Sequence, residues 1–80
     1  MTHQTDEGVL ARITSLVNEE NTLRSSPELD DAGRSREAAI RVELDQCWDL
    51  LRQRRALREF GEDPDRAKVR PASVVENYKQ

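Results

Sequence analysis

The fold is decided by residues 36–60, REAAIRVELDQCWDLLRQRRALREF. Apolar side chains recur in this stretch at the four-three spacing that places them on one side of an α-helix, and two arginines continue the row. The row consists of Ile40, Leu44, Cys47, Leu51, Arg54 and Arg58. Glycine is the common residue just beyond a helix end, so we expect the helix to end near Phe60 with Gly61 at the C′ position.

The apolar band of this helix is wide. Leu50 and Leu57 extend it on one side and Trp48 extends it on the other, so it covers about half of the helix circumference. The opposite side is polar and is expected to face solvent; it carries Asp45, Asp49, Arg52 and Gln53. One antiparallel partner helix covers a narrower seam than this band. The remainder must be covered either by the C-terminal tail or by a second copy of the chain.

A first helix is expected at about residues 6–25. Thr5 is a candidate N-cap, and Asp6 and Glu7 complement the helix dipole in the first turn. Helical spacing follows in Val9, Ile13, Leu16, Glu20 and Leu23, with Leu10 and Val17 to one side. Pro27 lacks an N–H group and disfavours helical geometry at Ser26, so the first helix should stop there.

The start of the second helix stays open between Pro27 and Ser35, with about 30–60 as its expected span. Ser26 could cap a helix that begins at Pro27, whereas Gly33 weakens helix formation locally. Either start leaves a connection of about 3 to 9 residues, which is typical of antiparallel neighbours. Residues 1–33 carry seven acidic and two basic side chains (−5), and residues 34–61 carry seven basic and five acidic ones (+2), so this pairing is electrostatically favourable.

Residues 62–80 form a tail of different character. Glu62 to Asp65 is a charged turn, and Val69-Arg70-Pro71 is expected to be extended. A short helix is predicted at about 71–78, with Pro71 at its first position. The tail carries four larger apolar side chains, which indicates that it docks on a surface: Val69, Val74, Val75 and Tyr78.

Composition excludes several classes of protein. Eighty residues make one domain, and with 36% charged and 35% hydrophobic residues a solitary core is marginal. A net charge of −3 and only three aromatic residues argue against a basic or base-stacking nucleic-acid platform. No apolar run is long enough for a membrane span, and residues 1–5, an expected flexible terminus, do not resemble a secretory signal. We therefore expect a cytoplasmic protein without membrane contact.

The arginines at the end of the second helix have two interpretations. Arg52, Arg54, Arg55 and Arg58 lie within two turns and could contact the phosphates of RNA or DNA. Alternatively, they are cations at a helix C-terminus, with Arg54 and Arg58 pairing across the hairpin with Asp6 or Glu7. The acidic balance of the chain favours the structural interpretation.

Other candidate residues are also better explained by packing than by chemistry. Trp48 is expected in the core or in a seam between copies, although it could anchor another protein. Cys47 lies on the apolar face, and His3, the one histidine, is in the terminus, so neither a thiol nucleophile nor a metal site is favoured. Glu20 interrupts the apolar row and should pair with an arginine or fix the register; catalysis would need a pocket, which a two-helix hairpin lacks.

The motif ELDQCWDLLRQRRA, residues 43–56, resembles the core of the family of small actinobacterial proteins called Domain of Unknown Function 2630. The resemblance continues through Gly61 to Asp65, Val69 to Pro71 and Val74 to Tyr78, and the first helix is similar too, whereas Ser25 to Ser35 departs from the pattern. It implies a cytosolic, mostly helical protein. It implies no activity or catalytic residue.

Together these observations predict an all-α fold: an antiparallel helical hairpin over 6–61 with a tail helix, paired with a second copy into a four-helix dimer. We expect a protein interaction or scaffold module that acts through self-association, with a nucleic-acid or ribosome associated factor as the alternative. We expect no enzyme activity, cofactor or metal. Contacts to a partner are expected from Trp48, Leu50, Leu57, Arg52, Arg54, Arg55 and Arg58.

Overall fold

The computed structural model describes residues 5–26, 28 and 30–77. Within them the chain forms helix α1 (Asp6–Arg24), helix α2 (Asp31–Glu59), the short 3₁₀ helix η1 (Pro64–Arg66) and helix α3 (Ala72–Asn77). These described residues contain no strand, which confirms the prediction of an all-α fold.

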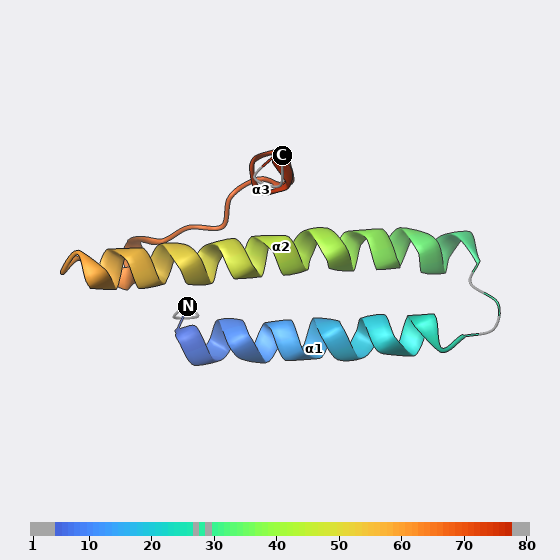
Figure 1. Ribbon diagram of the computed structural model, residues 1–80. Helices are drawn as coiled ribbons and strands as arrows, with labels where there is room; N and C mark the ends of the chain where they lie inside the picture. The colour runs from blue at the N-terminus through green and yellow to red at the C-terminus, as the bar shows by residue number, and fades with distance from the viewer. Residues whose placement is uncertain (1–4, 27, 29, 78–80) are drawn as a thin grey trace.

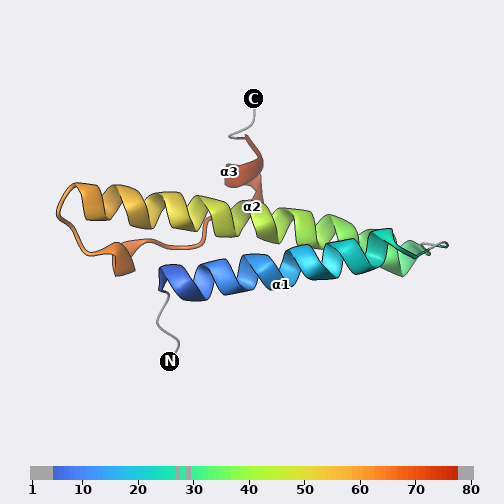
Figure 2. The ribbon, with the colours of Figure 1, turned by 60° about the horizontal axis from the view of Figure 1, so that its bottom comes forward.

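The two long helices form an antiparallel hairpin, and the rest of the chain returns along α2 (Figure 1). After α2 the chain turns back through η1, follows α2 in an extended conformation and ends in α3, which lies across the middle of α2 (Figure 2). The molecule is elongated, with extents of 49 × 27 × 20 Å. The tail therefore adds a third layer to the hairpin.

Both long helices begin with the same local arrangement. The Thr5 hydroxyl accepts a hydrogen bond from the Gly8 N–H over 3.0 Å, and the Asp30 carboxylate accepts one from the Gly33 N–H over 2.8 Å. Each cap satisfies a backbone donor that has no partner within the helix. The predicted cap at Thr5 is confirmed. The open question at α2 is resolved in favour of Asp30 as its cap, while the alternative start at Pro27 lies outside the described residues.

Gly61 ends α2 as the sequence predicts. Its φ angle of 75° lies in the left-handed region, which glycine adopts without steric cost. The Gly61 N–H donates to the Arg58 carbonyl over 3.1 Å, and the Glu62 N–H donates to the Leu57 carbonyl over 2.7 Å. This pair of bonds is a Schellman motif. It reverses the chain so that the tail runs back along α2.

The core is small and lies along the seam of the hairpin. A cluster of buried side chains joins the first half of α1 to the second half of α2: Val9, Ile13, Leu50 and Leu51. Leu16 and Ile40 are completely buried further along the seam. Ala67 of the tail packs against the cluster, so the tail contributes to the core.

The apolar residues of the tail are not all docked. Val75 is only 3% exposed, whereas Val69 and Val74 are 54% and 41% exposed. Tyr78 lies outside the described residues. Helix α3 begins at Ala72, and the Pro71 carbonyl accepts hydrogen bonds from its first turn, so Pro71 precedes the helix instead of occupying its first position.

Candidate functional site

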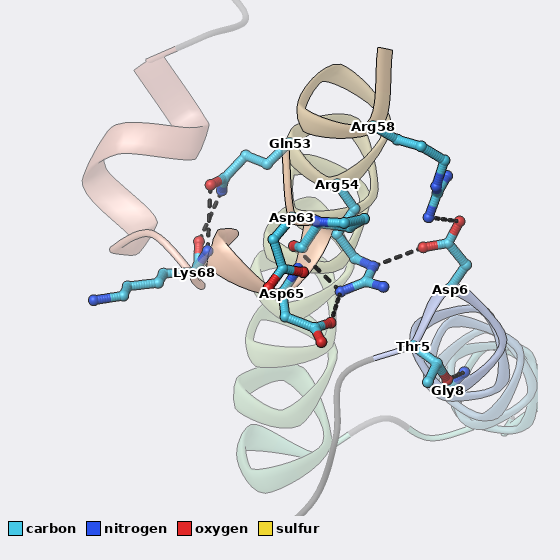
Figure 3. Close-up of polar contacts among 10 residues, drawn as sticks. Thr5, Asp6, Gly8, Gln53, Arg54, Arg58, Asp63, Asp65 and Lys68 are labelled. Carbon is cyan, nitrogen blue, oxygen red and sulfur yellow. Dashed lines mark hydrogen bonds and ion pairs between the residues drawn. The ribbon is translucent and has the colours of Figure 1, made fainter. Parts of the chain in front are cut away.

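Arg54 holds three parts of the chain together. Its guanidinium, only 7% exposed, donates from Nε to the Asp6 carboxylate over 2.6 Å and from Nη1 to the Asp65 carboxylate over 3.0 Å (Figure 3). Nη1 also lies 3.3 Å from the Pro64 carbonyl. Arg58 Nη2 lies 3.0 Å from the second oxygen of Asp6. The start of α1, the end of α2 and the turn at η1 thus converge on one buried cation, which we call the Arg54 clasp.

The clasp fixes the charge states of its members. The pKa of Asp6 is lowered, first by the hydrogen bond from Arg54 and against the opposing effect of burial. The pKa of Arg54 is raised, chiefly by the same bond with Asp6. Both groups are held ionised, which suits a structural pair. The clasp also supports the structural interpretation of the arginine cluster, because Arg54 and Arg58 pair across the hairpin with Asp6.

The tail is held by a polar row on α2. The Gln53 side-chain amide donates to the Lys68 carbonyl over 2.7 Å and accepts from the Lys68 N–H over 3.3 Å. Gln46 Nε2 donates to the Arg70 carbonyl over 3.0 Å. Asp49 between them is 2% exposed; it accepts from Gln53 over 2.8 Å and lies 3.4 Å from Arg70 Nε. Together Gln46, Asp49 and Gln53 form the tail-binding row.

This row corrects the prediction that Asp49 and Gln53 face solvent. The tail covers that side of α2, so the two side chains bond to it. A signal was present in the sequence, because Gln46, Asp49 and Gln53 repeat at three-four spacing, as a buried row does. Apolar periodicity alone does not detect a polar row of this kind.

The other predicted contact residues separate into two groups. Leu50 is 3% exposed and belongs to the core, and Arg54 is in the clasp, so neither offers a surface to a partner. Leu57 is half-buried, while Arg52 and Arg55 are exposed. The structure therefore does not present the four arginines as one basic patch.

Trp48 lies on the flank of the hairpin that the tail leaves uncovered, and it is 47% exposed. Leu10 and Val17, 45% and 38% exposed, stand two turns apart on α1, and Arg24 continues their row by two more turns. On α2, Glu37 stands three turns before Trp48. Arg24 Nε lies 3.6 Å from the Glu37 carboxylate, which places the two rows on the same flank. We call Leu10, Val17 and Trp48 the tryptophan face.

A groove of about 660 Å³ lies on the other flank, between α1, α2 and the tail. The expectation that a hairpin has no pocket is wrong, because the tail adds a third wall. The groove is lined by Gly8, Val9 and Arg12 of α1, by Ala39, Val42, Glu43, Gln46, Cys47 and Leu50 of α2, and by Val69 of the tail.

Cys47 and Glu20 have structural surroundings. Cys47 is half-buried, and burial raises the pKa of its thiol, which disfavours the thiolate that a nucleophile needs. Glu20 lies 3.4 Å from Arg24 on its own helix, so it pairs with an arginine as expected. The part of the chain that the structure describes contains no cluster of potential metal ligands, and His3 lies outside it.

Comparison with known proteins supports the resemblance seen in the sequence. The family described as "Protein of unknown function (DUF2630)" matches residues 5–80. The chain belongs to the DUF2630 family. This DUF2630 protein is 53% identical over 78 residues to uncharacterized proteins of Mycobacterium bovis and of two strains of Mycobacterium tuberculosis, which covers 92% of this chain and 90% of each relative. No solved structure matches it.

The described helices of this DUF2630 protein also bear on the membrane prediction. None of them is long and apolar enough to cross a bilayer. Both long helices carry charged side chains throughout their length.

Proposed function

We propose that this protein is an interaction module that self-associates through the tryptophan face. The observation that carries the proposal is that Trp48, Leu10 and Val17 are all exposed on one flank of the hairpin, the flank that the tail leaves open. Tryptophan is enriched among the residues that dominate binding energy at protein interfaces. The proposed role is binding, and the raised pKa of the Cys47 thiol argues specifically against a thiol nucleophile.

A second copy is the partner that the geometry favours. Ion pairs along the seam join α1 to α2 and set the register of the hairpin, and by this register Trp48 is level with the first half of α1, near Leu10. Trp48 and Leu10 thus lie at the same level of the hairpin. A twofold axis at that point would place the two Trp48 side chains against each other, with the exposed apolar side chains of α1 from each copy alongside, as a self-complementary interface requires.

The size of the core also favours assembly. A domain of 80 residues buries only about 60% of its unfolded surface, and self-association is a common supplement. Two hairpins joined through this flank would form a four-helix arrangement with the tails outside.

The one tryptophan makes the test specific to this site. The emission of Trp48 should shift to shorter wavelength as protein concentration rises, and light scattering after gel filtration should show twice the mass of one chain. Trp48→Ala should weaken dimerisation by about 2 kcal/mol. Lys68→Ala, at an exposed side chain of the tail and away from this flank, is the control.

A monomer mass at all concentrations, with emission that does not depend on concentration, would refute self-association. A dimer whose Trp48 emission stays that of an exposed indole would place the interface elsewhere. Either result would exclude the tryptophan face as the surface of self-association.

A further inference from the structure

We infer that the groove opposite the tryptophan face binds an uncharged, linear hydrocarbon chain, such as that of a free fatty alcohol. The inference is independent of self-association, because the groove and the tryptophan face lie on opposite flanks of the hairpin. It rests on the shape of the groove, on its lining and on the pairing of its charges.

The shape of the groove suits a slender ligand. Its floor follows α2 from Ala39 to Leu50, a length of about 16 Å at the rise of an α-helix. Its volume of about 660 Å³ lies within the range of about 300–1,000 Å³ that is typical of small-molecule sites. Gly8 and Val9 form one wall and Val69 forms the other. A trough of these proportions accommodates an extended chain better than a compact ring system.

The lining of the groove is mostly apolar. Six of the ten lining residues have hydrocarbon or thiol side chains, and they come from all three segments: Val9, Ala39, Val42, Cys47, Leu50 and Val69. Val69 is 54% exposed, although it lines the groove. An apolar ligand would remove this surface from water, which provides the driving force for binding.

The charged and polar side chains of the groove already have hydrogen-bond or ion-pair partners. Arg12 Nε donates to the Glu43 carboxylate over 2.6 Å, so the two charges compensate. Gln46 Nε2 is bound to the Arg70 carbonyl. An ionic ligand would have to compete with the Arg12–Glu43 pair for a counter-charge, whereas a neutral chain leaves the pair intact. The arrangement therefore selects an uncharged ligand.

Cys47 provides a readout within the groove, because it is the one cysteine of the chain and it lines the site. We would measure its alkylation by N-ethylmaleimide at mildly alkaline pH, with and without decanol. Bound decanol should slow the reaction several-fold. Decanol should also displace the neutral fluorescent probe N-phenyl-1-naphthylamine from the protein, and decanoate should do so less effectively.

A pair of variants localises the binding. Ala39→Phe places a ring in the groove and should weaken probe binding about tenfold. Ala38→Phe introduces the same ring at the preceding exposed position, which does not line the groove, and should bind the probe like the unmodified protein. Circular dichroism melts of both variants show whether the fold is retained. If a variant does not fold, the alkylation of Cys47 in the unmodified protein still tests the inference.

Several results would overturn the inference. One is unchanged alkylation of Cys47 at saturating decanol, and another is equal probe binding by a folded Ala39→Phe variant. If alkylation without ligand slows as protein concentration rises, a second copy fills the groove instead. If the protein sediments with phosphatidylcholine vesicles but does not bind decanol, the groove contacts a lipid surface and not a free chain.

Discussion

Gln53 and Lys68 exchange two hydrogen bonds, with the side-chain amide of Gln53 donating to the Lys68 carbonyl and accepting from the Lys68 N–H. The helix thereby binds the backbone of the tail much as a neighbouring β-strand would. Because only backbone atoms of residue 68 take part, the contact does not depend on the lysine side chain. Gln53 therefore helps to hold the tail in place, together with Gln46 and Asp49.

Gln53→Ala should destabilise the docked tail. The substitution removes both bonds to Lys68 and the one that Asp49 accepts, and we expect a loss of about 1 kcal/mol in the free energy of unfolding. Hydrogen exchange of the Lys68 amide should accelerate. Lys68→Ala retains both backbone bonds and serves as the control. Unchanged exchange in Gln53→Ala would mean that the Lys68 amide is protected by something else.

Truncation after Asp65 should lower the melting temperature and increase the fluorescence of a hydrophobic dye such as ANS. It retains the clasp partner Asp65 but removes Val75, which is 3% exposed, and it uncovers Asp49. Burial of a valine side chain contributes on the order of 1.5–3 kcal/mol before the cost of ordering the tail. An unchanged melting temperature, with no exchange protection for residues 66–77 in the intact chain, would show that the tail is not docked in solution.

Stability should fall in acid partly through Asp6. The pKa of Asp6 is lower in the folded chain, first because Arg54 donates a hydrogen bond to its carboxylate. The contribution of Asp6 to the free energy of unfolding is therefore present at pH values above its pKa in the unfolded chain, which is about 3.9. That contribution is lost as pH falls through the folded pKa. Asp6→Asn should cost about 1 kcal/mol at neutral pH, since the carboxylate is partly exposed, and the difference from the unmodified protein should shrink below about pH 4. Urea unfolding of both proteins between acid and neutral pH measures this difference in the free energy of unfolding. A difference that does not change with pH would contradict the role given to Asp6.

Leu51→Asp should abolish cooperative unfolding. Leu51 is 8% exposed at the centre of the hairpin seam, and an unpaired carboxylate there costs several kcal/mol, against a total stability of about 5–15 kcal/mol for a small domain. Circular dichroism melts test this. Ala56→Asp, at an exposed position of the same helix, should still melt cooperatively. A melt of Leu51→Asp like that of the unmodified protein would mean that another face is buried.

The parts of the fold that were predictable are those governed by local chemistry. Thr5 caps α1 and Gly61 ends α2 because cap geometry depends on a few neighbouring residues. The buried row through Ile40 and Leu51 follows from apolar spacing.

The tail-binding row and the groove were not predictable in the same way. Asp49 is polar, and its burial depends on where a segment some twenty residues later returns to α2. The groove requires Val69 of the tail to form a wall opposite α1, which no local pattern specifies. Periodicity assigns a side chain to a face of a helix, but it does not identify what covers that face.

The Arg54 clasp links the start of α1 to the turn that follows α2. Asp6 lies 48 positions before Arg54 and Asp65 lies 11 positions after it, yet both carboxylates bind the same guanidinium. Loss of the Asp6 contact would leave Asp65 as the remaining carboxylate of the clasp, so the charge balance at the turn of η1 depends on the start of α1. A change at the start of α1 should therefore alter hydrogen exchange around η1, because the two segments share one arginine side chain.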